Sequence, residues 1–323
     1  MSVTRGVPGS PPRPTPPLLP MQLVEDENGP LFSLAPELAI DTDVARRVIR
    51  EFIRGQLRQA GFKRALLGLS GGIDSALVAY LVADAIGADS LLCVSLPYRS
   101  SSRESLTDAE EVVRRLGATR EVIEITGVVD AYFGADGGPE AVVPDPEAAA
   151  KSSVRRGNFM ARTRMVVLYD RSVPWGGLVV GTSNKTEALI GYTTHFGDDS
   201  SAFNPIGDLY KSQVRQLALA VGVPEQIVRK APTADLWPGQ TDESEAGFSY
   251  PDLDRLLFWL VDRRRSPEDV VAMGFPPDMV KQVTRMVAAS EFKRQVPPVA
   301  KLGPRTPGVD YLYPRRRPGS ARV

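Results

Sequence analysis

The chain has 323 residues, and its 39 basic side chains balance its 39 acidic ones. That length allows one large α/β domain or two smaller ones, and the balanced charge gives no reason to expect a nucleic-acid partner or a membrane surface. The single cysteine, Cys93, excludes disulfides and cysteine-based zinc sites within the chain. With no run near the roughly 18 apolar residues of a membrane span and no signal-type apolar start, we expect a cytoplasmic protein.

The first 40 residues predict a disordered, proline-rich N-terminal arm. The run from Gly9 to Pro17 is dominated by prolines, which can neither continue a helix nor donate to a strand ladder. From Asp41 the pattern changes, because apolar residues recur at spacings of three and four over residues 44–57, and Gly61 follows as a helix stop. We therefore expect the folded domain to begin at residue 41.

Beyond that helix, strands and helices alternate along the chain. The expected elements are strands over 65–69, 91–96, 121–125 and 178–181, helices over 75–86, 104–116 and 153–172, and a surface loop over 134–146. Such alternation is typical of right-handed crossovers. It predicts an α/β fold with a mostly parallel sheet covered by helices on both faces.

The remainder of the chain predicts helices and then a tail. The expected helices cover 209–221, 224–229, 251–261, 267–273 and 276–289, with a loop over 231–247. A single domain should therefore span residues 41–303. Residues 304–323, which include the run Arg315 to Arg317, predict a basic, flexible C-terminal tail.

A turn rich in glycine and serine joins the expected strand over 65–69 to the helix over 75–86. Its sequence is Ser70-Gly71-Gly72-Ile73-Asp74-Ser75, and the adjacent glycines allow positive φ and a close approach of the backbone to a ligand. The helix that follows points free N–H groups at the turn, which favours an anion. Neither a Walker A loop nor a GxGxxG fingerprint fits this spacing. An ordinary strand-to-helix turn is the alternative, but the serines and paired glycines favour phosphate binding.

A second string, Gly181-Thr182-Ser183-Asn184-Lys185-Thr186-Glu187, follows the fourth expected strand. In parallel sheets ligands bind at the carboxyl ends of the strands, where this string and the turn at Gly71 both lie. Three further strings accompany them, namely Gly157–Met165, Pro205–Lys211 and Pro232–Leu236. Taken together, from about Val44 to Leu302, these strings resemble the ammonia-dependent NAD synthetase family, which belongs to the N-type ATP pyrophosphatases.

The resemblance implies a Rossmann-like fold of the adenine nucleotide alpha-hydrolase type and a carbon–nitrogen ligase. ATP would adenylate the nicotinate carboxylate of deamido-NAD with release of pyrophosphate, and ammonia would then displace AMP to give NAD. This chemistry needs positioned charges rather than a protein nucleophile. The implied ATP-binding residues are Gly68, Leu69, Ser70, Gly71, Gly72, Ile73, Asp74, Ser75, Thr182, Lys211 and Thr233.

By the same resemblance, Asp74 and Glu187 occupy the ligand positions of the cofactor Mg²⁺, which prefers oxygen ligands. Asp74 and Lys211 are the implied catalytic residues, with Lys211 as a point charge for phosphate oxygens. Without the resemblance, Glu187 would be interpreted as a solvated helix residue and Lys211 as a surface lysine. The implied deamido-NAD site consists of Arg162, His195, Asp199, Phe292 and Lys293.

The acid-binding half departs from the family's better-known bacterial form at three positions. His195 stands where that form has lysine, Ala202 where it has aspartate and Phe292 where it has histidine. Asp198 and Asp199 are candidates to supply the missing carboxylate. Two alternatives therefore stay open: an adenylating amidase for a different carboxylate, and a nucleotide-binding homologue without catalysis. The intact metal and phosphate residues argue against the second.

The nitrogen donor and the partners are also predicted. A glutaminase would need a cysteine nucleophile and a long extra domain, and Cys93 lies in an expected strand, so we expect free ammonia or ammonia from a separate donor protein. The resemblance further implies a homodimer. It also implies a mobile covering loop at Trp237–Glu243, which would keep water away from the adenylate.

Overall fold

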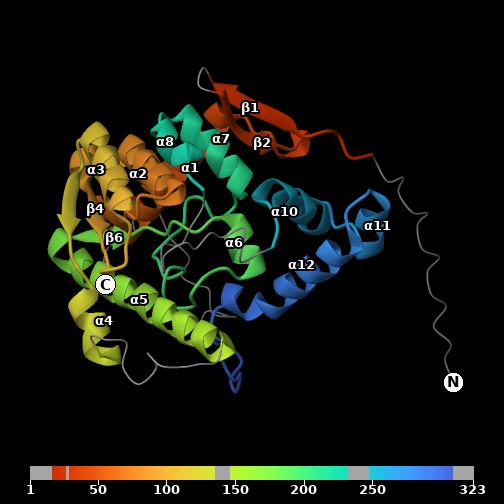
Figure 1. Ribbon diagram of the computed structural model, residues 1–323. Helices are drawn as coiled ribbons and strands as arrows, with labels where there is room; N and C mark the ends of the chain where they lie inside the picture. Colours follow the sequence, from red (N-terminus) through yellow and green to blue (C-terminus); the bar gives the residue numbers. More distant parts are fainter. Residues whose placement is uncertain (1–16, 27–28, 135–145, 232–246, 308–323) are drawn as a thin grey trace.

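The computed structural model describes residues 17–26, 29–134, 146–231 and 247–307. Figure 1 shows an α/β molecule with helices on both sides of a parallel sheet. The described strands of that sheet are β3 (Arg64–Gly68), β4 (Leu91–Ser95), β5 (Thr119–Val122) and β6 (Gly177–Val179). They lie in the order β5-β4-β3-β6, and every neighbouring pair is parallel. The predicted fold class is confirmed.

The described helices are α1 (Thr42–Ala60), α2 (Ile73–Ile86), α3 (Arg103–Leu116), α4 (Thr126–Phe133), α5 (Pro146–Trp175), α6 (Lys185–Ile190), α7 (Lys211–Ala220), α8 (Glu225–Arg229), α10 (Tyr250–Leu257), α11 (Pro267–Ala272) and α12 (Pro277–Ala289).

The two faces of the sheet bury different cores. On one face Leu67 and Cys93 share a core with α1, α2 and α7, and on the other Leu66 and Leu92 share a core with α4 and α5. This division follows from the two-residue period of a strand.

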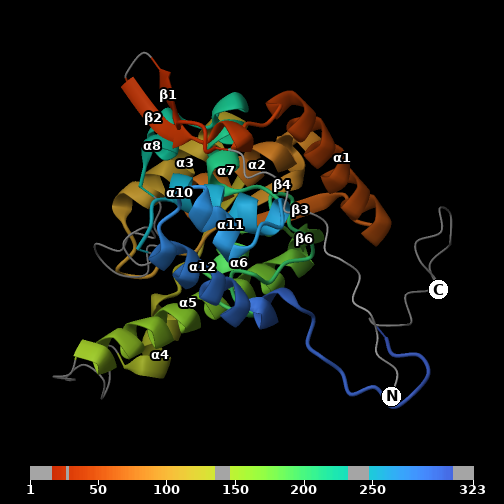
Figure 2. The same ribbon diagram turned by 90° about the vertical axis from the view of Figure 1, so that its right-hand side faces the viewer.

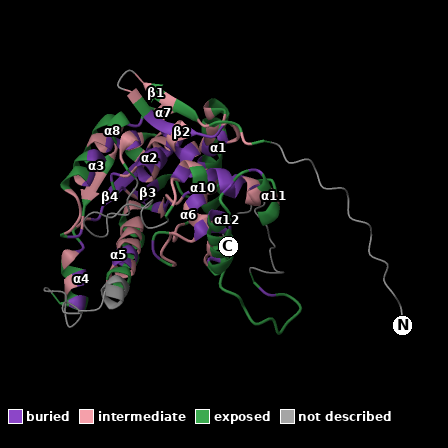
Figure 3. Ribbon diagram, turned by 45° about the vertical axis from the view of Figure 1, so that its right-hand side comes forward, coloured by how far each residue is buried: buried purple, intermediate pink, exposed green. Residues whose placement is uncertain are grey.

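Helix α2 lies at the centre of the larger core. It is apolar on nearly all sides and buried along most of its length (Figure 3), and such a helix is stable only when other elements surround it. It contacts β3 and β4 on one side and α1, α3 and α7 on the others. In β4 beside it, burial raises the pKa of the Cys93 thiol to about 12, as expected for a core residue.

Several predicted boundaries shift in the structure. The strand expected over 121–125 is β5 at Thr119–Val122, because the chain leaves the sheet and turns at Ile125 into α4. The helix expected from residue 153 already begins at Pro146 as α5. The short helices α4 and α6 were not predicted. No helix within the described ranges is long and apolar enough to cross a membrane.

The N-terminal arm is the main correction to the sequence analysis. Part of the stretch predicted to be disordered forms an antiparallel hairpin of β1 (Gln22–Asp26) and β2 (Gly29–Leu34). Phe32 and Leu34 are buried in the larger core, since β2 packs against α7 and α8. Figure 2 shows this hairpin on the opposite side of the molecule from α4 and α5. The predictions for residues 1–16 and 308–323 lie outside the described residues.

Replacing Phe32 by alanine tests the place of the hairpin in the core. Phe32→Ala should lower the free energy of unfolding by about 3–5 kcal/mol, because it empties a buried aromatic site. Leu23→Ala, at an exposed position of β1, is the matched control and should change it by less than about 0.5 kcal/mol. Chemical denaturation measures both values. Equal stability of the two variants would show that the hairpin is dispensable for the core.

Candidate active site

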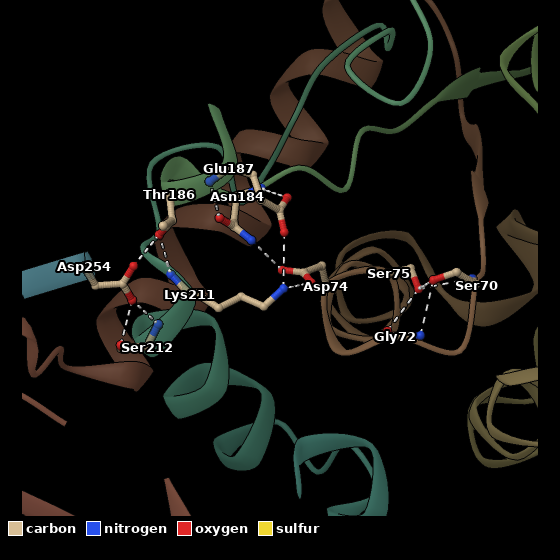
Figure 4. Close-up of polar contacts among 10 residues, drawn as sticks. All are labelled: Ser70, Gly72, Asp74, Ser75, Asn184, Thr186, Glu187, Lys211, Ser212 and Asp254. Carbon is tan, nitrogen blue, oxygen red and sulfur yellow. Dashed lines mark hydrogen bonds and ion pairs between the residues drawn. The ribbon is translucent and has the colours of Figure 1, made fainter. Parts of the chain in front are cut away.

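The turn between β3 and α2 has the geometry of an anion-binding loop. Gly71 has a φ of +84°, and a Cβ there would lie 2.1 Å from the backbone oxygen of Ser105, so only glycine fits. Ser75 Oγ accepts the Ser70 N–H at 3.2 Å and donates to the Gly72 oxygen at 3.0 Å. Ser70 Oγ in turn accepts the Gly72 N–H at 3.2 Å (Figure 4). The two serines therefore hold the loop in a compact cradle at the start of α2.

Three helix starts meet at the ammonium group of Lys211 (Figure 4). Its Nζ lies 2.5 Å from Asp74 Oδ2 and 3.2 Å from Glu187 Oε1. Asp74 is in the first turn of α2, Glu187 is in the first turn of α6, and Lys211 begins α7. Because the Lys211 side chain is only 3% exposed, the two carboxylates supply the compensation that a buried cation needs. The structure thus brings together the residues predicted for metal and phosphate chemistry.

Asn184 joins the two carboxylates into one unit. Its side-chain oxygen accepts the Glu187 N–H at 3.0 Å, and the Glu187 carboxylate accepts the Asn184 N–H at 3.3 Å, which forms a capping box at the start of α6. The side-chain nitrogen of Asn184 donates to Asp74 Oδ1 at 2.9 Å. The sequence analysis did not assign Asn184 to the site, although the Asn-x-x-Glu spacing was a signal for the cap.

A cavity of about 490 Å³ opens beside this cluster, which is a size suited to a nucleotide. The predicted phosphate loop from Gly68 to Ser75 borders it, as do Lys211 and Thr182, which follows β6. Asp198 also lines the cavity, and its Oδ1 accepts the backbone N–H of Thr194 at 2.8 Å. Two predicted parts, Thr233 and the covering loop Trp237–Glu243, lie outside the described residues.

The carboxylates of Asp74 and Glu187 fit a magnesium ion that is bound together with phosphate. In nucleotide sites Mg²⁺ uses one or two carboxylates and takes its other ligands from phosphates and water. Both side chains line the cavity and contact the same ammonium group. In the part of the chain that the structure describes, no three acidic, histidine or cysteine side chains gather as a metal site, so an ion here would depend on the substrate for ligands.

The loop that follows α6 carries His195 and Asp199, and two further predicted acid-binding residues, Arg162 and Phe292, contact His195 from other elements. His195 Nδ1 lies 2.9 Å from Asp199 Oδ2, and the His195 ring meets Phe292 edge-on with centroids 6.0 Å apart. Arg162 Nε donates to the backbone oxygen of His195 at 3.2 Å. Neighbours of His195 in this loop, among them Thr194 and Gly197, line the cavity. The predicted acid-binding side chains therefore lie next to residues that line the cavity, but they do not line it themselves.

Lys293 has a different position from the one its predicted role suggests. Its ammonium group donates to the backbone oxygens of Gly191 at 2.7 Å and Thr193 at 2.6 Å. Gly191 ends α6 with a φ of +75°, so these bonds fix the first residues of the loop. In this structure Lys293 supports the loop that carries His195.

Replacing Gly71 by alanine tests the phosphate loop. Gly71→Ala should weaken ATP binding by more than about tenfold, or ~1.4 kcal/mol, because the added Cβ collides with the Ser105 backbone. Gly55→Ala is the matched control, since a Cβ at that position of α1 meets nothing within 4 Å. Calorimetric titration with ATP gives both affinities, and thermal unfolding shows that both variants fold. An unchanged affinity in Gly71→Ala would contradict the assignment of the loop.

The fold and the site define the class of the protein first. A parallel sheet with a glycine–serine loop and a carboxylate-bound lysine at its carboxyl edge is the arrangement expected of an α/β protein with a phosphorylated ligand. A family model described as NAD synthase matches residues 45–297. The chain belongs to the NAD synthase family, and the predicted ligase class is confirmed.

Individual relatives agree with this family. The NH(3)-dependent NAD(+) synthetases of Chlorobium phaeovibrioides and Trichlorobacter lovleyi are each 48% identical to the chain. Each alignment covers 86% of this chain, together with 96% of the Chlorobium protein and 97% of the Trichlorobacter protein. Among solved structures, an NH3-dependent NAD synthetase from Campylobacter jejuni has a TM-score of 0.66 at 30% identity and is covered completely, with 81% of this chain matched. An NMN synthetase from Francisella tularensis has a TM-score of 0.67 at 27% identity, with 81% of this chain and 99% of that chain matched.

Proposed function

We propose that the chain catalyses the ATP-dependent amidation of deamido-NAD to NAD, with ammonia as the nitrogen donor. The observation that carries this proposal is the contact of Lys211 with both Asp74 and Glu187 beside the phosphate loop. A nucleotide-binding homologue without catalysis has less support, because the residues for phosphate transfer lie in mutual contact. The relatives named NH(3)-dependent, which the chain covers almost completely, support free ammonia.

The reaction consists of two transfers. In the first, an oxygen of the nicotinate carboxylate attacks the α-phosphorus of ATP, the bond from that phosphorus to the bridging oxygen breaks, and pyrophosphate leaves. In the second, ammonia adds to the carbonyl carbon of the acyl adenylate, the bond to the AMP oxygen breaks, and the nitrogen loses a proton. Because negative charge develops on phosphate oxygens, fixed cations and N–H donors are the groups that accelerate these steps.

The groups of this chain supply position and charge for those transfers. The backbone at Gly72 and the hydroxyl groups of Ser70 and Ser75 would hold the leaving pyrophosphate, and Lys211 would compensate its charge. Asp74 and Glu187 would hold Mg²⁺, which neutralises phosphate charge when it is bound. Since Lys211 contacts both carboxylates, the cationic and acidic parts of the site are already at contact distance from each other.

The acid substrate is assigned to deamido-NAD through the curated relatives. A second candidate is the deamido form of NMN, which the likeness to the Francisella tularensis NMN synthetase favours. Two of the three residues that depart from the family's better-known form, His195 and Phe292, are in ring contact with each other near the cavity. A different acid would therefore be recognised at this cluster while the phosphate loop served the same adenylation.

An assay with both acids distinguishes these candidates. Purified protein with ATP, Mg²⁺, ammonium and deamido-NAD should form NAD and AMP in equal amounts, and glutamine should replace ammonium poorly. Deamido-NMN as the preferred acid would select the second candidate. Amide formation from neither acid, by a protein that binds ATP, would overturn the proposed function.

Removing either carboxylate tests the metal assignment. Asp74→Ala and Glu187→Ala should each lower kcat by more than about 100-fold, because the charge that would hold the metal is lost. Glu110→Ala removes an exposed carboxylate of α3 and should keep full activity. Steady-state rates at several Mg²⁺ concentrations, with circular dichroism to confirm folding, are the measurement. Near-normal rates in either site variant would remove that residue from the metal site.

We also propose that two copies of the chain associate through the layer of α4 and α5. Val128 and Tyr132 lie on one side of α4, and Val166 and Val173 lie on one side of α5, all of them exposed. The two helices contact each other, and exposed apolar side chains on adjacent helices are typical of protein contacts. Val166→Glu should shift the sedimentation of a dimer toward that of a monomer, whereas sedimentation of the parent chain as a monomer would contradict the proposal.

A further inference from the structure

Asp254, on α10, is a buried carboxylate to which the reaction described above gives no role. Its exposed fraction is 0%, and Figure 4 shows it on the side of Lys211 that faces away from Asp74. A buried carboxylate costs several kcal/mol unless hydrogen bonds and charges compensate it. The groups that compensate Asp254 belong to the two helices that carry Lys211 and Glu187.

The first of these helices is α7, which Asp254 caps from outside. Ser212 donates to Asp254 Oδ2 twice, from its backbone N–H at 2.7 Å and from its hydroxyl group at 2.6 Å. The first N–H groups of a helix have no partner within the helix, and an acceptor with negative charge is favourable there. Asp254 therefore fixes the start of the helix in which Lys211 is the first residue.

The second helix is α6, which Asp254 reaches through Thr186. The hydroxyl group of Thr186 donates to Asp254 Oδ1 at 2.5 Å and accepts the backbone N–H of Lys211 at 3.0 Å. Thr186 precedes Glu187 in the chain. The carboxylate of Asp254 consequently determines how the backbone that carries Glu187 lies against the backbone that carries Lys211.

The three donors are consistent with an ionised Asp254. An ionised carboxylate only accepts hydrogen bonds, and all three of these groups donate to it. Burial holds the pKa of Asp254 above its ordinary value, although the hydrogen bonds from Ser212 and Thr186 and the charge of Lys211 reduce the rise. The network is therefore matched to a carboxylate rather than to an amide.

The helix that carries Asp254 is itself fixed from the opposite side. Arg255 Nε donates to Glu37 Oε1 at 2.7 Å, and Trp259 Nε1 donates to the same carboxylate at 3.0 Å. Glu37 belongs to the short 3₁₀ turn that follows the N-terminal hairpin. This anchor gives α10 a defined position from which Asp254 can orient α6 and α7.

We propose that Asp254 is a positioning residue that sets the separation of Lys211 from Glu187 and thereby the affinity of the site for magnesium-bound ATP. The proposal rests on the function proposed above. A purely structural Asp254 would contribute to stability alone. A positioning Asp254 also changes how ATP binding responds to Mg²⁺, and this difference can be measured.

The test compares Asp254→Asn with the parent protein. The amide keeps the shape but turns one acceptor into a donor that faces Thr186 or Ser212, so the affinity for ATP in the presence of Mg²⁺ should fall by about 10- to 100-fold. Affinity for ATP in the presence of a chelator should fall much less. Asp252→Asn is the matched control, because it changes an exposed aspartate in the same helix whose carboxylate accepts a hydrogen bond from Ser249 instead of Ser212 or Thr186. Calorimetric titration requires no acid substrate, so the result stands even where the proposed amidation fails.

A double-mutant cycle adds a readout that a stabilising role would not produce. If Asp254 acts through Lys211, Asp254→Asn should add almost nothing to the loss already caused by Lys211→Ala. Full additivity, or an unchanged response to Mg²⁺ in a folded Asp254→Asn protein, would overturn the proposal.

Thr186 supplies the second route if Asp254→Asn does not fold. Thr186→Ser keeps the bridging hydroxyl group and should retain Mg²⁺-dependent ATP affinity. Thr186→Val removes the hydroxyl group and should show the same 10- to 100-fold decrease in that affinity, which is about the loss expected for a disturbed supporting contact. Equal ATP affinities in these two variants would contradict the bridge between Asp254 and Lys211.

Discussion

The buried ammonium group of Lys211 is the constraint on which the arrangement of the site depends. A cation removed from water needs carboxylates close by, and Asp74 and Glu187 provide them from the segments that follow β3 and β6. These two strands are neighbours, but the chain runs from β3 to β5 on one side of the sheet and returns to β6 on the other. Such a reversal leaves a crevice at the carboxyl ends of the strands. Charge compensation and sheet topology therefore specify the same place for the ligand.

The helix starts at this crevice have separate tasks. The N-terminal ends of helices carry partial positive charge and attract anions. At α7 that charge is compensated from behind, since Asp254 accepts the backbone N–H of Ser212. At α2 the loop of Gly71 and Gly72 faces the cavity. The loop before α2 thus offers a helix start to a phosphorylated ligand, while α7 contributes the side-chain charge of Lys211.

The sequence predicted those parts of the structure whose signals are local. The strands β3, β4 and β6 and the loop at Gly71 are encoded by contiguous residues. The cap at Asn184 also has a local signal, the Asn-x-x-Glu spacing, but the sequence analysis did not use it. Asp254 has no such signal, because its partners Thr186 and Ser212 lie 68 and 42 residues away in the chain. The hairpin around Phe32 was missed for a similar reason, since it is held by tertiary packing against α7 and α8, and the prolines before it suggested an unfolded arm.

The two halves of the site are held by different kinds of contact. In the predicted phosphate half the side chains support one another, so a change in Asp74 or Glu187 would leave Lys211 poorly compensated. In the acid half the loop after α6 is held through its backbone, by Lys293 and by Arg162. Side chains such as His195 can therefore change without loss of the shape of the loop. The three predicted departures, at His195, Ala202 and Phe292, all belong to the predicted acid-binding half, where the contacts that hold the loop leave room for such changes.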